Sequence, residues 1–145
     1  MKGRSLPAVV LALIALLFVT LGARADDLKA MEGTWTVEAA AAGGKPVESD
    51  DIKALVVKIT GDRYEVRTKD GMDFGSLKLD ETQKPKTMDA TRTEGFDAGK
   101  MIKAIYEITG DTMRVCYAFD GGERPTELTT KDGLAWVLIT YKREK

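Results

Sequence analysis

A hairpin motif occurs twice in this chain of 145 residues, first as Ile59-Thr60-Gly61-Asp62-Arg63-Tyr64-Glu65-Val66. The second copy, Ile108-Thr109-Gly110-Asp111-Thr112-Met113-Arg114-Val115, matches the first at five of eight positions. In each copy Gly-Asp separates two runs in which apolar and polar residues alternate, the pattern of a two-residue turn between antiparallel strands. Glycine supplies the positive φ that such a turn needs. Two copies are too few for a solenoid, so we interpret them as one hairpin device used twice.

Outward from this motif, turn signals recur about every ten residues, among them Gly43-Gly44, Asp70-Gly71 and Asp132-Gly133. Strands separated by turns at this spacing are typical of an all-β sandwich or barrel. One helical turn is expected over residues 50–54, with Ser49 as its N-cap. We predict eight strands, over residues 34–39, 55–60, 63–68, 72–79, 87–93, 101–109, 112–119 and 134–142.

The eight strands are expected to close into an antiparallel up-and-down barrel, because closure removes the two unpaired edges of an open meander. An eight-stranded barrel has an interior that side chains fill or that holds one small ligand. A face-to-face sandwich is the alternative that the same pattern allows. The apolar stripes assigned to the interior are Leu55, Val57, Ile59, Tyr64, Val66, Leu77, Leu79, Ile102, Tyr106, Ile108, Met113, Val115, Tyr117, Val137, Ile139 and Tyr141.

Residues 1–25 have the three parts of a secretory signal peptide. Lys2 and Arg4 precede an apolar run from Leu6 to Leu21, and Ala23-Arg24-Ala25 fits a small-x-small cleavage site. The run is about 16 residues long, shorter than the ~20 that span a bilayer. We therefore predict cleavage, with a retained anchor as the alternative. The mature domain is then residues 26–145, periplasmic or extracellular and without a stable membrane anchor.

Composition narrows the classes of function. Cleavage would remove Lys2, Arg4 and Arg24 and leave 19 basic against 23 acidic residues, a formal charge of −4. Such a dispersed negative charge is a poor match for nucleic acid. The chain contains no His and a single cysteine, Cys116, so it holds no His-based triad and no intrachain disulfide. We predict that the protein is not an enzyme and binds no cofactor or metal, and that Cys116 is a small packed residue.

Gly33-Thr34-Trp35, which opens the first expected strand, resembles the Gly-x-Trp start of lipocalins and related calycin barrels. Over residues 28–145 the chain further resembles an uncharacterised lipocalin-like domain family that is common in planctomycete bacteria. The resemblance implies a lipocalin-like barrel and no established activity. The other matching segments are Gly44-Lys45-Pro46-Val47, Ile59-Thr60-Gly61-Asp62-Arg63-Tyr64, Lys84-Pro85-Lys86-Thr87-Met88-Asp89, Ile105-Tyr106-Glu107-Ile108 through Gly110-Asp111, Val115-Cys116-Tyr117-Ala118 and Arg124-Pro125-Thr126-Glu127.

Three residues are expected to close the fold. In lipocalin-like barrels a Trp such as Trp35 plugs the closed end, covered by an Arg from the last strand, so the resemblance implies that Arg143 stacks on Trp35 through a cation–π contact. Ligand stacking is the alternative role for Trp35. Arg124 stands beside Pro125 in a connector and is expected to fasten it to the barrel through paired hydrogen bonds to carbonyls.

Four residues are candidates to contact a ligand: Arg92, Tyr64, Tyr106 and Tyr117. If Met88 faces the interior, alternation places Arg92 there as well, where a charge must lie near the mouth or be paired. A salt bridge at the rim is the expected role of Arg92, and contact with an anionic headgroup is the alternative.

Two functions are compatible with these residues. The first is an exported, non-enzymatic module that binds a small apolar or amphipathic ligand in the barrel. The second is an envelope protein-interaction or structural domain whose barrel is packed solid and holds no ligand. A cavity above ~300 Å³ would favour the first function. An interior filled by tyrosine side chains would favour the second.

Overall fold

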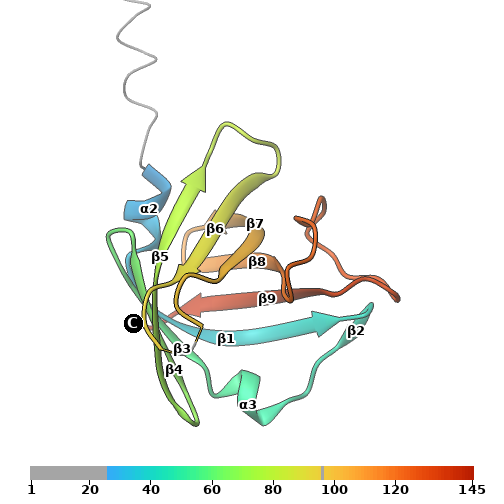
Figure 1. The fold of residues 1–145 in the computed structure, drawn as a ribbon, viewed down its shortest axis with the longest axis horizontal. Coiled ribbons are helices and arrows are strands. Elements are labelled where there is room, and N and C mark those ends of the chain that lie inside the picture. Colours follow the sequence, from blue (N-terminus) through green and yellow to red (C-terminus); the bar gives the residue numbers. More distant parts are fainter. Residues whose placement is uncertain (1–25, 96) are drawn as a thin grey trace, which may run out of the picture.

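The computed structural model describes residues 26–95 and 97–145, so the signal-peptide prediction for residues 1–25 lies outside the described residues. Within the described part, eight antiparallel strands form a closed barrel (Figure 1). Each strand pairs with the next along the chain, and the last pairs with the first. The predicted up-and-down barrel is confirmed, and the sandwich alternative is wrong.

The elements agree closely with the sequence pattern. In the described part of the chain two short helices, α2 (Asp26–Met31) and α3 (Asp50–Lys53), lie outside the barrel wall. The short strand β2 (Lys45–Pro46) adds a two-residue pairing to the end of the first strand. The barrel strands are β1 (Gly33–Ala42), β3 (Val56–Thr60), β4 (Arg63–Thr68), β5 (Gly71–Asp80), β6 (Lys86–Arg92), β7 (Met101–Thr109), β8 (Thr112–Ala118) and β9 (Trp136–Arg143).

The repeated motif forms two tight hairpins. Thr60 pairs with Arg63 around the first turn, and Thr109 pairs with Thr112 around the second. The two turn glycines, Gly61 and Gly110, have φ values of 60° and 59°. A glycine with positive φ at the first central position is the requirement of a type II′ turn, whose twist matches that of the flanking strands.

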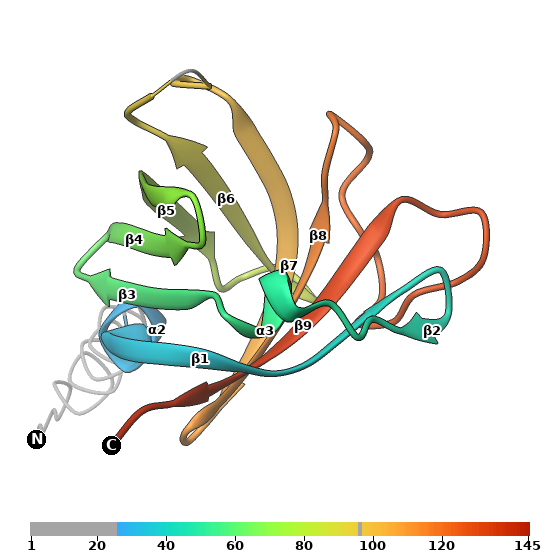
Figure 2. The ribbon, with the colours of Figure 1, turned by 90° about the horizontal axis from the view of Figure 1, so that it is seen from below.

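Strand connections divide the barrel into two ends. Segments 61–62, 81–85 and 110–111 connect strands at the end that we name the closed end, where α2 also lies (Figures 1 and 2). Segments 43–55, 69–70, 93–100 and 119–135 connect strands at the opposite, open end. Because neighbouring strands run in opposite directions, the position of a residue along its strand determines whether its inward side chain lies near the closed end or near the open end.

The interior is built from alternate residues of each strand. Trp35, Val115, Ala104 and Tyr106 are almost completely inaccessible to solvent. Of the stripes assigned from sequence, Val66, Leu79, Ile102, Ile108, Tyr117 and Val137 pack against this core while keeping partial exposure.

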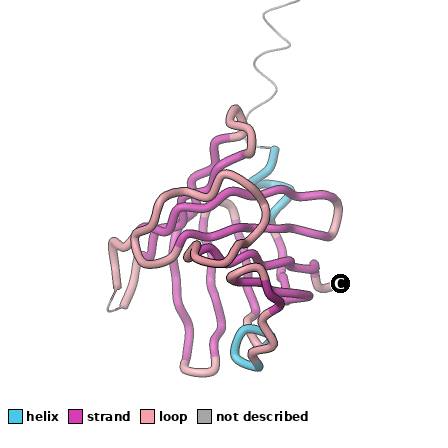
Figure 3. The backbone as a smooth tube through the Cα atoms, turned by 90° about the vertical axis from the view of Figure 1, so that its right-hand side faces the viewer, coloured by secondary structure: helices cyan, strands magenta, loops and turns pink. Residues whose placement is uncertain are grey.

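A second apolar layer lies on the outside of the wall. Ile105 and Cys116 are direct partners across β7 and β8, and both are buried although their neighbours in sequence face the interior. The connector of residues 119–135 covers them, with Pro125 fully buried and the Cys116 thiol 3.6 Å from the Thr129 carbonyl oxygen. This connector is the long loop that faces the viewer in Figure 3. The small packed role expected for Cys116 is confirmed.

Arg124 holds the connector in place. Its Nη1 donates to the carbonyl oxygens of Met88, at 3.1 Å, and Ala104, at 2.8 Å, and its Nη2 donates to Asp89 at 2.5 Å. These are the carbonyl contacts expected from the sequence, made to two neighbouring strands at once. A guanidinium is suited to this task because its donors are fixed in one plane.

Two details differ from expectation. Ser49 occupies the N-cap position of α3, as predicted, but its side chain makes no capping hydrogen bond. The predicted capping interaction is therefore wrong. The chain folds into α2 just before β1, an element that the sequence reading did not include. At six residues, α2 is too short for a clear periodicity and depends on its contacts with the barrel.

Candidate functional site

A cavity of about 230 Å³ occupies the barrel interior toward the open end. Its walls are mainly aliphatic and aromatic, and polar groups are few. The lining residues are Leu55, Val57, Ile59, Tyr64, Val66, Thr68, Asp73, Leu77, Met88, Ala90, Arg92, Ile102, Met113, Val115, Tyr117, Phe119, Ile139 and Tyr141. The interior is therefore not packed solid. The volume of the cavity is nevertheless smaller than the ~300 Å³ that would favour ligand binding.

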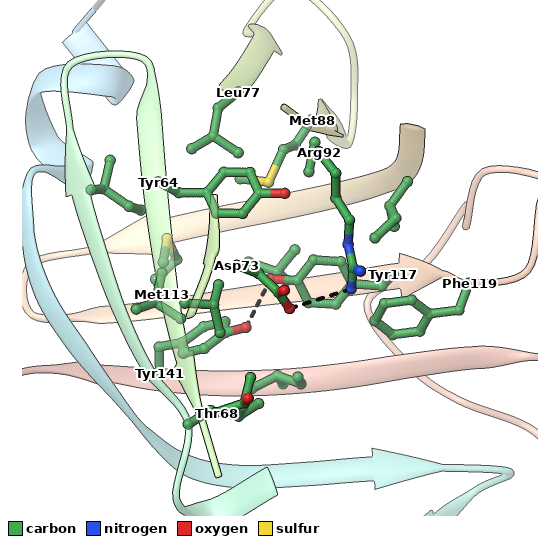
Figure 4. Close-up of a pocket in the computed structure, with 18 residues that line it drawn as sticks. Tyr64, Thr68, Asp73, Leu77, Met88, Arg92, Met113, Tyr117, Phe119 and Tyr141 are labelled. Carbon is green, nitrogen blue, oxygen red and sulfur yellow. Dashed lines mark hydrogen bonds and ion pairs between the residues drawn. The ribbon is translucent and has the colours of Figure 1, made fainter. Parts of the chain in front are cut away.

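One glycine makes room for a tyrosine in the wall. Gly75 of β5 pairs directly with Tyr64 of β4, and the Tyr64 ring lies over it. A Cβ built on Gly75 would overlap the Tyr64 ring. The missing side chain of Gly75 therefore sets the direction in which Tyr64 enters the cavity (Figure 4).

Two further tyrosines meet inside the cavity. The hydroxyl groups of Tyr117 and Tyr141 lie 2.8 Å apart and share a hydrogen bond (Figure 4). Burial raises the pKa of Tyr117 well above its usual range and that of Tyr141 to about 12. Both side chains are neutral at physiological pH, so each hydroxyl can donate one hydrogen bond and also accept.

Three charged or aromatic side chains mark the open end of the cavity, which we name the mouth: Asp73, Arg92 and Phe119. Arg92 Nη1 donates to Asp97 at 3.1 Å, and Arg92 Nη2 lies 3.6 Å from Asp73 Oδ2. The Phe119 ring stacks on Tyr117 with centroids 5.3 Å apart. Arg92 is thus placed where the sequence expected it, in a salt bridge at the rim, and it also lines the cavity.

The Tyr64 hydroxyl is the least satisfied polar group in this cavity. Tyr64 is 9% exposed, yet its hydroxyl makes no hydrogen bond within residues 26–95 and 97–145. Burial raises the pKa of Tyr64, while the charge of Arg92 lowers it and that of Asp73 raises it. The hydroxyl therefore lies within electrostatic range of both charges and has hydrogen-bonding capacity to spare.

Tyr106 does not belong to this cavity, which corrects its assignment as a ligand-binding candidate. Its side chain points inward but lies at the closed end, where its hydroxyl donates to Asp27 Oδ2 at 2.8 Å. Lys86 Nζ lies 2.8 Å from the same oxygen. Burial and the Asp27 carboxylate raise the pKa of Tyr106, so this hydroxyl is a structural donor that anchors α2.

The closed end is sealed by Trp35 and Arg143. The Trp35 indole is fully buried and donates from Nε1 to the Met31 carbonyl oxygen at 2.8 Å. The Arg143 guanidinium lies over the ring, 4.3 Å from its centroid, and donates to the carbonyl oxygens of Ala30 and Glu32. Gly33, which opens β1, has a φ of 131°, a backbone conformation that strains any residue with a side chain, and a Cβ there would also lie 2.9 Å from Arg143 Nη1. Trp35 does not line the cavity.

Sequence reasoning missed Asp73, Phe119 and Tyr141 as site residues. Asp73 stands two residues before Gly75 and four before Leu77, on the inward side of β5. Phe119 continues the inward series of Val115 and Tyr117 beyond the end of β8. Strand alternation, extended to the strand ends, is the signal that identifies both residues.

No group of three or more His, Cys, Asp and Glu side chains in the described part of the chain is arranged to hold a metal ion. Neither helix among residues 26–95 and 97–145 is long and apolar enough to cross a membrane.

Comparison with known proteins yields no relative: no family model, no curated protein and no solved structure matches this chain. The resemblance to a planctomycete lipocalin-like family therefore stays a prediction.

Proposed function

We propose that this protein is a non-enzymatic binding module that takes a small amphipathic molecule into the open end of its barrel. The observation that carries the proposal is the apolar cavity of about 230 Å³, with polar groups gathered at the mouth. A site with apolar walls and a few placed polar groups is the usual form of a small-molecule site. Export from the cytoplasm, which rests on residues 1–25, is part of the same proposal.

The size of the cavity limits the ligand. Sites for drug-sized ligands have volumes of about 300–1,000 Å³, so a cavity of about 230 Å³ suits a smaller molecule. Tyr64, Tyr117 and Tyr141 leave this space open rather than filling it, which supports binding over the alternative of a solid structural barrel. Fold alone would not carry this conclusion, because barrels of one architecture serve many functions.

Native mass spectrometry of the protein purified from its own cell envelope tests the proposal. A reproducible adduct of small mass that is lost on denaturation is expected. A cavity-filling variant, Ala90→Leu, supplies the matched comparison, because Ala90 is buried and lines the cavity. It should lose the adduct while retaining its melting temperature. Protein that carries no adduct, or a variant that keeps it, would count against binding inside the barrel.

A further inference from the structure

The mouth of the cavity contains one carboxylate more than its cation can neutralise. Arg92 lies between Asp97, to which it donates at 3.1 Å, and Asp73, which it approaches only to 3.6 Å. The Arg92–Asp97 contact is the hydrogen-bonded pair. Asp73 is ion-paired with Arg92 but makes no hydrogen bond within the described residues, so its oxygens can accept from a donor.

Two groups that make no hydrogen bond among the described residues thus face one small space. Asp73 lines the cavity with its side chain 41% exposed, and Tyr64, a largely buried residue, lines it with a hydroxyl that has no hydrogen-bond partner among the described residues. Figure 4 shows both side chains pointing into the same cavity, with the Arg92 guanidinium beside Asp73. A ligand head that donates several hydrogen bonds would satisfy the two groups together.

The charged side chains paired at the mouth have the same sign preference. Asp73 and Asp97 carry two negative charges there, against the single positive charge of Arg92. A carboxylate ligand would compete with Asp73 and Asp97 for Arg92 and add a third negative charge. A cationic head leaves the Arg92–Asp97 pair intact and neutralises Asp73.

We propose that the head group taken by this cavity is a protonated primary amine, with Asp73 as its counter-ion, the Tyr64 hydroxyl as an acceptor and the apolar tail inside the barrel. This inference rests on the proposed binding function. It makes Asp73 the specificity-determining residue of the site. The stacked rings of Tyr117 and Phe119 at the mouth offer the cation an aromatic face.

Isothermal titration calorimetry with three probes of equal chain length tests this class of ligand: 1-hexylamine, 1-hexanol and hexanoate at pH 7. Alkyl amines are protonated at this pH. A hydrogen bond to a charged group contributes about 1.5–3 kcal/mol, so hexylamine should bind about tenfold or more tightly than hexanol. Hexanoate should bind more weakly than hexanol.

Asp73→Asn should reduce the affinity for hexylamine about tenfold and leave that for hexanol within about twofold. Retained hexanol binding also establishes that the variant is folded. Asp70→Asn is the matched control, because it removes the same charge from a turn residue that does not line the cavity. Tyr64→Phe, which keeps the ring, should lower the hexylamine affinity about threefold through loss of one acceptor.

The outcomes separate the two proposals. If hexanol binds and Asp73→Asn behaves as Asp70→Asn does, the amine inference is overturned and the binding function stands. If the unmodified protein binds hexanoate most tightly of the three probes, the amine inference is likewise overturned and the binding function stands. If none of the three probes binds, both proposals fall.

Discussion

The two ends of this barrel differ in whether selected polar side chains have hydrogen-bond partners. At the closed end, the indole of Trp35, the guanidinium of Arg143 and the carboxylate of Asp27 all have bonded partners and tie α2 to the wall. At the open end, the Tyr64 hydroxyl and the Asp73 carboxylate line an unfilled space without hydrogen bonds among the described residues. Satisfied groups stabilise a fold, whereas groups left unsatisfied beside a cavity are available to a ligand.

The contrast predicts that stability is concentrated at the closed end. Trp35→Ala should lower the free energy of unfolding by about 3–5 kcal/mol, the usual cost of emptying a fully buried Trp site. Phe119→Ala, an aromatic truncation at the mouth, should cost about 1 kcal/mol because Phe119 is only partly buried. Urea unfolding followed by circular dichroism measures both. Equal losses would remove the distinction between the ends.

Arg143→Ala sharpens the comparison within the closed end. It should lower the free energy of unfolding by about 1–3 kcal/mol, since it removes the cation–π contact with Trp35 and two hydrogen bonds that hold α2. Affinity for 1-hexanol should not change, because Arg143 does not line the cavity. An unchanged melting temperature would argue against Arg143 as part of the seal.

Asp27 gives the closed end a pH dependence. Burial raises the pKa of Asp27, but hydrogen bonds from Lys86 and Tyr106 and the charge of Lys86 outweigh it, so the folded-state pKa lies below 3.8. A lowered pKa contributes stability that is fully present above the unfolded value and is lost as pH falls through the folded value. The unmodified protein should therefore lose stability more steeply below pH 3.8 than Asp27→Asn does, in urea titrations at each pH. Parallel curves would contradict the Asp27 anchor.

Arg92→Gln should have the smallest effect on stability. Its ion pairs with Asp73 and Asp97 lie at a partly exposed rim, where such pairs contribute about 0–1 kcal/mol. Thermal melts should place this variant within a few degrees of the unmodified protein. A loss comparable to that of Arg143→Ala would show that the mouth is a structural seal as well.

The fold could be predicted from the sequence because its determinants are local. Gly61 and Gly110 each fix a two-residue turn, and the alternation that flanks them assigns a buried face to the four strands that they connect, β3, β4, β7 and β8. The Ile105 and Cys116 layer outside the barrel could not be predicted in the same way, because a connector many residues away covers it. The alternation of apolar and polar residues predicts whether a side chain faces the interior or the outside of the barrel. It does not predict whether another segment covers the outside.

The site was only partly predictable for a related reason. Tyr64 and Tyr106 have the same inward pattern, yet one lines the cavity and the other bonds to α2. Depth along the barrel depends on strand stagger, which alternation does not report. The pairing of Arg92 with Asp97, by contrast, could be predicted from the sequence, because a charge near a strand end needs a nearby partner and Asp97 lies in the following loop.

Two-dimensional NMR of the protein titrated with 1-hexanol tests the division between a sealed end and an accessible one most directly. Signals from Tyr64, Val66 and Tyr117 should shift in a saturable way, while the Trp35 indole N–H, hydrogen-bonded at the closed end, stays in place. Shifts confined to residues outside the barrel, or an indole signal that moves together with the cavity signals, would contradict it.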